Sequence, residues 1–242
     1  MTRHPSLPPR SLPLPLAAVL AGSLWLGGCA GTLERVDDAD GGAAEAYTRL
    51  GVAYLERNNL PRAMSALDRA LEHDPAAPEA LQAMAVVYQR QGEDELADEA
   101  FQRALKSDPE LTRARNNYAA FLYDRGRTAE ACEQLERATQ DTQYRRRAQL
   151  FANLGRCRRE QGEFDAARTS LERAVSLDPR YAAAYLRLAD LALAEGEPAQ
   201  ARRQLERYIS LAGETAEARA LADEIATARS TDDTVRGDPD AP

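Results

Sequence analysis

Cysteine and histidine carry most nucleophilic, redox and metal-binding chemistry, and this chain of 242 residues holds only three cysteines and two histidines. His4 lies in a predicted leader, so His73 is the one imidazole in the rest of the chain. His73 ends a predicted helix, where a cation favours the helix dipole, and we interpret it as structural. The sequence also lacks a Gly-rich phosphate loop and an HExxH motif. We therefore expect no enzyme activity, no metal, no cofactor and no small-molecule substrate.

Cys29 follows the features of an export signal. Arg3 and Arg10 precede an apolar run at residues 16–26, which is far shorter than the ~20 residues that span a bilayer. Gly27 and Gly28 then lead into Cys29, and this order resembles the bacterial lipobox. The resemblance implies that residues 1–28 are a lipoprotein signal peptide and that Cys29 is acylated. The alternative is an ordinary secretory signal that happens to contain a cysteine.

Acylation would attach the chain to a membrane, since each buried CH₂ of an acyl chain contributes ~0.8 kcal/mol. Ala30, rather than Asp, follows the cysteine. By resemblance to Gram-negative sorting rules, we expect a lipid-anchored protein on the outer membrane that faces the periplasm.

The other two cysteines, Cys132 and Cys157, fall in consecutive predicted helices. If these helices are antiparallel neighbours, the two cysteines lie at similar heights along them and close together, and an oxidising compartment permits a disulfide. The alternative is two small buried thiols, and the sequence favours neither reading.

The composition predicts an all-α fold with wet outer faces. Ala, Leu, Arg and Glu are abundant, aromatic residues make up 6% and charged residues 29%, and no run alternates in the way a strand requires. The net charge is −8, and removal of the leader leaves 29 basic against 39 acidic residues, or −10. Such a surface repels phosphate backbones, so we expect no nucleic-acid partner.

Internal repeats organise the helices. Asp74-Pro75, Asp108-Pro109 and Asp178-Pro179 close similar segments, and the first two are 34 residues apart, which is the period of a tetratricopeptide repeat. Small residues recur where paired helices must approach closely, as at Ala63, Ala97 and Ala131. Glycines at 92, 126, 162 and 196 mark the turns within pairs.

One such pair cannot bury its apolar face, so the copies must stack. We predict a right-handed superhelix of five helix pairs with a C-terminal capping helix. The third and fourth copies are out of step by two residues within 141–147, which predicts a longer connection there. The predicted segments are a flexible tether at 29–43, repeats at 44–77, 78–111, 112–145, 148–181 and 182–215, a capping helix at 216–229 and a disordered tail at 230–242.

The first helix of each pair should line a groove in which a protein partner binds. Asn117 and Asn153 hold the same position in successive repeats, and a carboxamide can both donate to and accept from a peptide backbone. The alternative is that these asparagines are merely solvated. By repeat position the groove-facing residues are Arg49, Val52, Gln82, Val86, Gln89, Asn116, Asn117, Ala120, Tyr123, Asn153, Arg156, Arg187 and Asp190.

Several segments resemble one family more closely. Asn116-Asn117-Tyr118, Phe121-Leu122-Tyr123 and Phe151-Ala152-Asn153-Leu154-Gly155 are similar to the type IV pilus biogenesis lipoproteins called PilW or PilF. The resemblance covers roughly residues 44–215 and the lipobox. It implies a pilotin, which binds the pilus secretin subunit and promotes its outer-membrane localisation and multimerisation. The alternative function is another lipid-anchored periplasmic repeat adaptor, which organises envelope hydrolases or serves a different pilus or secretion system.

Overall fold

The structure, a computed structural model, describes residues 35–236. The predicted signal peptide and Cys29 lie outside these residues. The described part contains eleven α-helices and no strand, which confirms the all-α prediction. In chain order they are α1 (Arg35–Glu56), α2 (Leu60–His73), α3 (Pro78–Gln91), α4 (Asp94–Ser107), α5 (Thr112–Asp124), α6 (Thr128–Ala138), α7 (Arg147–Glu160), α8 (Phe164–Leu177), α9 (Ala182–Ala194), α10 (Pro198–Ala212) and α11 (Ala216–Arg236).

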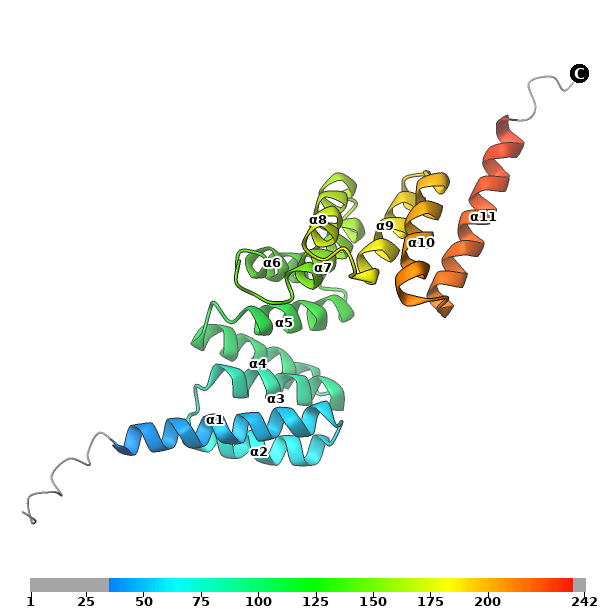
Figure 1. Ribbon diagram of the computed structural model, residues 1–242. Helices are drawn as coiled ribbons and strands as arrows, with labels where there is room; N and C mark the ends of the chain where they lie inside the picture. The colour runs from blue at the N-terminus through cyan, green and yellow to red at the C-terminus, as the bar shows by residue number, and fades with distance from the viewer. Residues whose placement is uncertain (1–34, 237–242) are drawn as a thin grey trace, which may run out of the picture.

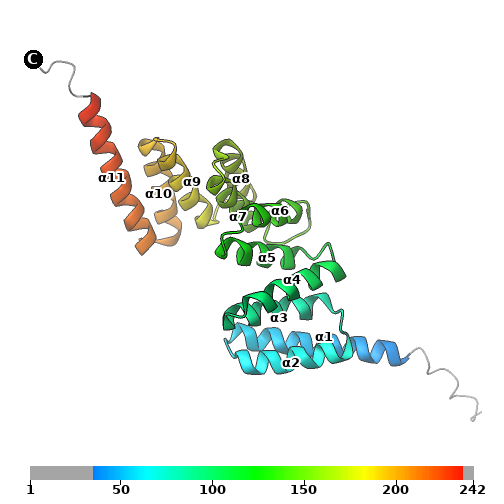
Figure 2. The same cartoon turned by 180° about the vertical axis from the view of Figure 1, so that it is seen from behind.

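The helices pack as five consecutive pairs, from α1 with α2 to α9 with α10. The pairs stack in chain order, so α1 and α11 lie at opposite ends of a bent rod (Figures 1 and 2). The last helix, α11, packs against α10 and α9 and closes the end of the stack. None of the described helices combines the length and the apolar character needed to cross a bilayer.

Left-handed residues make the turns within the pairs, because the chain must reverse in very few residues. Gly92, Gly126, Gly162 and Gly196 all have positive φ, between 73° and 80°, at the predicted positions. The first pair has Asn58 in this role, with φ of 54°. Asparagine tolerates this conformation better than most residues with a side chain, so the first turn needs no glycine.

Small residues set the spacing between paired helices. Ala63, Ala97 and Ala131 are fully buried, as the repeat predicts. At Gly51 the approach is closer still, since a Cβ atom there would lie 2.6 Å from Cγ of Leu67. Large side chains fill the remaining space, among them Phe101. The core is therefore a strip that runs along the stack, because each pair buries its apolar face against the next.

The Asp of each Asp-Pro dipeptide shapes the turn between pairs. Oδ1 of Asp74, Asp108 and Asp178 accepts a hydrogen bond from the backbone N–H two residues later, each at 2.9 Å. Asp141 does the same for the N–H of Gln143 at 2.8 Å, although no proline follows it. The turn chemistry is thus retained where the sequence repeat falls out of step.

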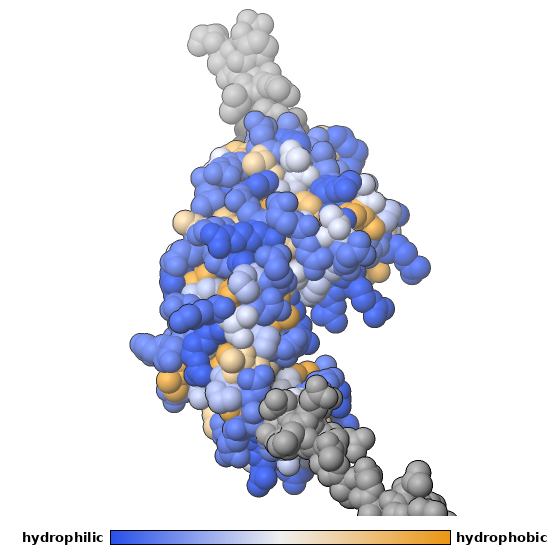
Figure 3. Space-filling model, turned by 90° about the vertical axis from the view of Figure 1, so that its left-hand side faces the viewer, coloured by the Kyte–Doolittle hydropathy of each residue, from blue (hydrophilic) through white to orange (hydrophobic). Residues whose placement is uncertain are grey.

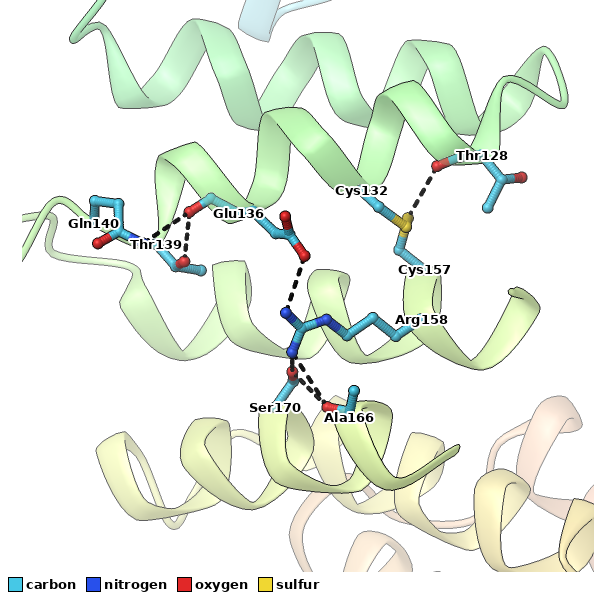
Figure 4. Close-up of polar contacts among 9 residues, drawn as sticks. All are labelled: Thr128, Cys132, Glu136, Thr139, Gln140, Cys157, Arg158, Ala166 and Ser170. Atoms are coloured by element: carbon cyan, nitrogen blue, oxygen red, sulfur yellow. Dashed lines mark hydrogen bonds and ion pairs between the residues drawn. A yellow bond between two sulfur atoms is a disulfide. The ribbon is translucent and has the colours of Figure 1, made fainter. Parts of the chain in front are cut away.

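The connection between the third and fourth pairs is longer than the others. Residues 139–146 join α6 to α7, whereas 74–77 and 108–111 suffice elsewhere. A disulfide between Cys132 and Cys157 links these same two helices, with the Cα atoms 5.6 Å apart (Figure 4). Arg158 of α7 also contacts both neighbouring helices, as it donates to Glu136 at 3.0 Å and to Ser170 at 2.9 Å (Figure 4). The longer loop is therefore accompanied by covalent and polar links between the two repeats.

The two terminal helices extend further than predicted. α1 begins at Arg35, so residues 35–43 of the predicted tether are helical. A Cβ atom at Gly41 or Gly42 would meet nothing within 4 Å, so this extension receives no packing there. α11 continues to Arg236, into the predicted disordered tail. Adding residues to a packed helix avoids the cost of nucleation, which explains why composition misjudged both ends.

Candidate protein-binding groove

The predicted groove residues all lie on the first helix of a pair. These first helices are α1, α3, α5, α7 and α9. Among them, α1 contacts α3, α3 contacts α5, and α7 contacts α9. In the side view, the surface of the stack is hollowed at mid-height (Figure 3). By helix the residues are Arg49 and Val52 on α1; Gln82, Val86 and Gln89 on α3; Asn116, Asn117, Ala120 and Tyr123 on α5; Asn153 and Arg156 on α7; and Arg187 and Asp190 on α9.

Burial removes two of these residues from the accessible wall. Gln82 is only 4% exposed and Asn116 only 8%. Val86 is half-buried and packs against the core, while Ala120 is exposed. Repeat position predicted that Gln82 and Asn116 face the groove, but both side chains are buried, and Asn116 is bonded to Asn153 of α7. Asn116 can act only through the residues that it bonds.

The N-terminal end of the groove is a cavity of about 530 Å³. It lies between α1, the start of α3 and Arg113 of α5, and Arg49 and Val52 line it. Its floor is apolar and its rim is largely acidic, with Glu45 paired to Arg49. The other lining residues are Gly41, Ala44, Thr48, Ala53, Glu56, Asp74, Ala77, Pro78 and Glu79.

The middle of the groove holds a chain of hydrogen bonds across three helices. The Arg187 guanidinium donates to Oδ1 of Asn153 at 3.1 Å. Asn153 in turn donates through Nδ2 to Oδ1 of Asn116 at 3.0 Å, and Asn116 donates to Asn117 at 3.5 Å. We call these four residues the amide–arginine ladder. The ladder joins predicted site residues from α5, α7 and α9, so the asparagines are not simply solvated.

Aromatic stacking and an ion pair fix the side chains beside the ladder. The Arg156 guanidinium carbon lies 4.0 Å from the centre of the Tyr123 ring, in a cation–π contact. Arg159 forms an ion pair with Asp190 at 2.8 Å and a second with Glu160 at 3.1 Å. Asp190 is thus committed to an arginine within the protein and is not a free acid in the groove.

The electrostatics of this region follow from burial. Burial lowers the pKa of Arg187, and the nearby positive charge of Arg156 lowers it further. Burial raises the pKa of Asp190, although the Arg159 charge opposes that shift. Burial likewise raises the pKa of Tyr123. Arg156 and Arg187 are therefore like charges held close together in a partly dry site.

The sequence reading missed two residues of the groove, Arg159 and Arg113. Arg159 lies one helical turn after Arg156, so its position was readable from the helix period. Arg113 reaches the cavity from a later repeat, and only the stacking of α5 on α3 brings it there. No group of three metal-binding side chains occurs in the described part of the chain. The site can offer hydrogen bonds, positive charge and a shallow apolar cavity.

The large hydrophobic residues that are exposed in the described part of the chain are scattered. They are Leu50 on α1, Leu96 on α4 and Phe164 on α8. The face seen in Figure 3 is mostly hydrophilic, with small separate apolar spots. Recognition in the groove should therefore depend on polar contacts more than on an apolar patch.

Comparison with solved structures found two pilus proteins. Pseudomonas aeruginosa PilF is 35% identical, with a TM-score of 0.73, and the match covers 82% of this chain and 90% of that one. PilW, a widely conserved type IV pilus biogenesis factor, is 25% identical with a TM-score of 0.67, over 79% of this chain and 92% of that one. YrrB, a repeat protein with an unusual peptide-binding site, is 21% identical, with a TM-score of 0.60, over 73% and 90%, and shows the fold alone.

Comparison with curated proteins gave no match. Family profiles described as tetratricopeptide repeats match residues 30–87, 54–109, 110–180 and 158–225. These ranges together cover the helix pairs that the structure describes. The chain belongs to the tetratricopeptide-repeat family.

Proposed function

We propose that this chain is a non-enzymatic assembly factor for type IV pili, of the PilF and PilW kind. The observation that carries the proposal is the 35% identity to PilF over 82% of this chain and 90% of that one. A match of that length extends over several repeats and is not confined to one. The relation to PilW, at 25% identity, points to the same process.

In this proposal the partner is the pilus secretin subunit, which the groove holds while the secretin reaches the outer membrane and multimerises. The fold supports binding rather than catalysis, since stacked repeats offer a long inner wall to a protein segment. The connected side chains of α5, α7 and α9 supply polar contacts along that wall.

We further propose that acylated Cys29 anchors the chain to the outer membrane, facing the periplasm. The lipobox-like order of residues before Cys29 supports the anchor. The disulfide between Cys132 and Cys157 supports export, because disulfides persist in oxidising compartments such as the periplasm.

The test is to delete the gene for this chain in a strain that produces pili, and to compare the deletion strain with its parent. We expect secretin monomers to accumulate at the expense of heat-resistant multimers in outer-membrane fractions. Re-expression of the chain should restore the multimers, and the Cys29→Ala variant should fail to do so at equal abundance. Intact outer-membrane multimers in the deletion strain would refute the proposed role.

A further inference from the structure

Arg156 and Arg187 have no carboxylate partner within the described part of the chain. Two neighbouring arginines of α7 have one: Arg159 pairs with Asp190, and Arg158 pairs with Glu136 at 3.0 Å. Arg187 instead donates to a neutral amide, and Arg156 stacks on a phenol ring. Nε is buried without a hydrogen-bond partner in Arg156, Arg158 and Arg159 alike, so the lack of a carboxylate at the guanidinium end is what distinguishes Arg156.

Such an arrangement is costly to the fold. A partly buried positive charge without a negative partner loses hydration that a neutral partner replaces only in part, and two such charges close together repel each other. The lowered pKa of Arg187, caused by burial and by the Arg156 charge, reflects the same cost. The cost is also unexpected in a chain whose net charge is −8, where acidic residues outnumber basic ones.

The two guanidinium groups are held in place before any ligand arrives. Asn153 and Arg156 are three residues apart on α7 and so share a face of that helix. Tyr123 of α5 holds the Arg156 side chain in place by stacking, and Asn153 of α7 holds Arg187 in place by accepting its hydrogen bond. Ala120 lies between Asn116 and Tyr123 along α5, and its small side chain is exposed. A ligand side chain therefore meets no large side chain at position 120.

We propose that Arg156 and Arg187 bind the carboxylate of an aspartate or glutamate side chain in an extended segment of the protein partner. Guanidinium groups bind carboxylates through paired, charge-assisted hydrogen bonds. The amides of the ladder, above all Asn117 on its open end, then bond the segment's backbone on either side of the acidic residue. This inference rests on the proposed function for its premise that a protein segment enters the groove.

The test is an NMR titration of the purified full chain with three pentapeptides, of which two are blocked at both ends. The first is acetyl-Ala-Ala-Glu-Ala-Ala-amide, and the second has Gln in place of Glu. The third is acetyl-pentaalanine with a free terminal carboxylate. The signals observed are the side-chain Nε–H groups of Arg156 and Arg187 and the side-chain amide of Asn153.

We expect the Glu peptide to shift these signals and to bind about ten-fold more tightly than the Gln peptide, since bonds to charged groups are the stronger ones. The double variant Arg156→Gln/Arg187→Gln should lose this preference. Arg202→Gln should keep it, because Arg202 is an exposed arginine of α10 paired with Glu206. The comparison of Glu with Gln on the unaltered chain does not depend on the folding of any variant.

Equal binding of the Glu and Gln peptides, or no binding of the Glu peptide, would overturn the proposal. Tighter binding of the free-carboxylate peptide would also overturn it, because the site would then capture a chain terminus. No pilus component takes part in this experiment. Its failure would remove the carboxylate site and leave the secretin phenotype of the deletion strain unaffected.

Discussion

At the scale of single residues, the groove differs from the rest of the molecule in how its arginines are paired. Arg168 of α8 contacts two carboxylates that follow α9, those of Glu195 and Glu197. Arg187, by contrast, donates to the neutral amide of Asn153 and pairs with no carboxylate among residues 35–236. The first arrangement stabilises the stack, whereas the second holds a charge in place at the expense of stability.

This contrast predicts that an Arg→Gln substitution affects the free energy of unfolding differently at positions 187 and 168. Arg187→Gln removes a partly buried charge that has no carboxylate partner, so the free energy of unfolding should stay within about 0.5 kcal/mol or increase. Arg168→Gln leaves the largely buried Glu195 without its partner and should lower that free energy by roughly 1–3 kcal/mol. Urea unfolding of both variants would measure the difference. A larger loss in Arg187→Gln than in Arg168→Gln would mean that Arg187 is a structural residue.

At the scale of elements, the period of small residues sets how closely paired helices pack. Ala97 has no exposed surface, so a larger side chain there must displace its neighbours. Ala97→Leu should lower the free energy of unfolding by roughly 1–3 kcal/mol, whereas Glu99→Leu, on the exposed side of α4, should change it by less than about 0.5 kcal/mol. Thermal unfolding of the two variants tests this, and equal melting temperatures would show that the packing register is wrong.

The long connection before α7 also depends on one carboxylate. Asp141 accepts from the Thr112 hydroxyl at 2.7 Å and from the Gln143 N–H, and these bonds hold the pKa of Asp141 below its usual 3.8. A carboxylate whose pKa is lowered on folding stabilises the protein above its unfolded pKa, and this contribution disappears as the pH falls through the folded pKa.

Asp141→Asn should therefore be less stable than the unaltered chain at pH 7, by an amount of the order of one hydrogen bond, roughly 0.5–1.5 kcal/mol. The difference should shrink as the pH falls below about 4. Melting temperatures of both proteins between pH 3 and pH 7 would show this. A difference that stays constant over that range would exclude the ionised carboxylate as its cause.

The sequence predicted the elements well because their causes are local. Turn glycines, buried alanines and Asp-Pro dipeptides act within one pair, and they recur at Gly92, Ala97 and Asp108 where expected. The helix ends at Arg35 and Arg236 could not be predicted from composition. These end residues extend a helix whose other residues are already packed, so they avoid the cost of nucleation.

The groove was predicted less completely, because its details depend on how the repeats stack. Repeat position placed Asn116 and Gln82 on the wall, but their burial follows from neighbouring helices. The bond from Asn153 to Asn116 joins the repeats on either side of the irregular connection, and the bond from Arg187 to Asn153 joins the fourth and fifth repeats. The period of a repeat predicts which residues share one face of a helix. It does not predict which residues of another repeat that face contacts.

At the scale of the whole molecule, an acidic, elongated stack carries two different zones along one groove. The N-terminal zone is an apolar cavity with a mainly acidic rim, near Arg49 and Val52. The central zone contains the amide–arginine ladder and the unpaired charges of Arg156 and Arg187. A segment that fits both zones would carry an apolar or basic stretch and an acidic residue further along, which gives it a direction in the groove.

The central claim is that the partner lies in the groove and not against the outer helices. It can be tested by photo-crosslinking in membranes of pilus-producing cells, with the photoreactive residue at Ala120 or Tyr123 of α5, and at the exposed Arg103 of α4 or Glu172 of α8 as controls. We predict crosslinks to the secretin subunit from the two α5 positions and none from the two controls. Secretin crosslinks from Arg103 or Glu172, with none from α5, would contradict the account.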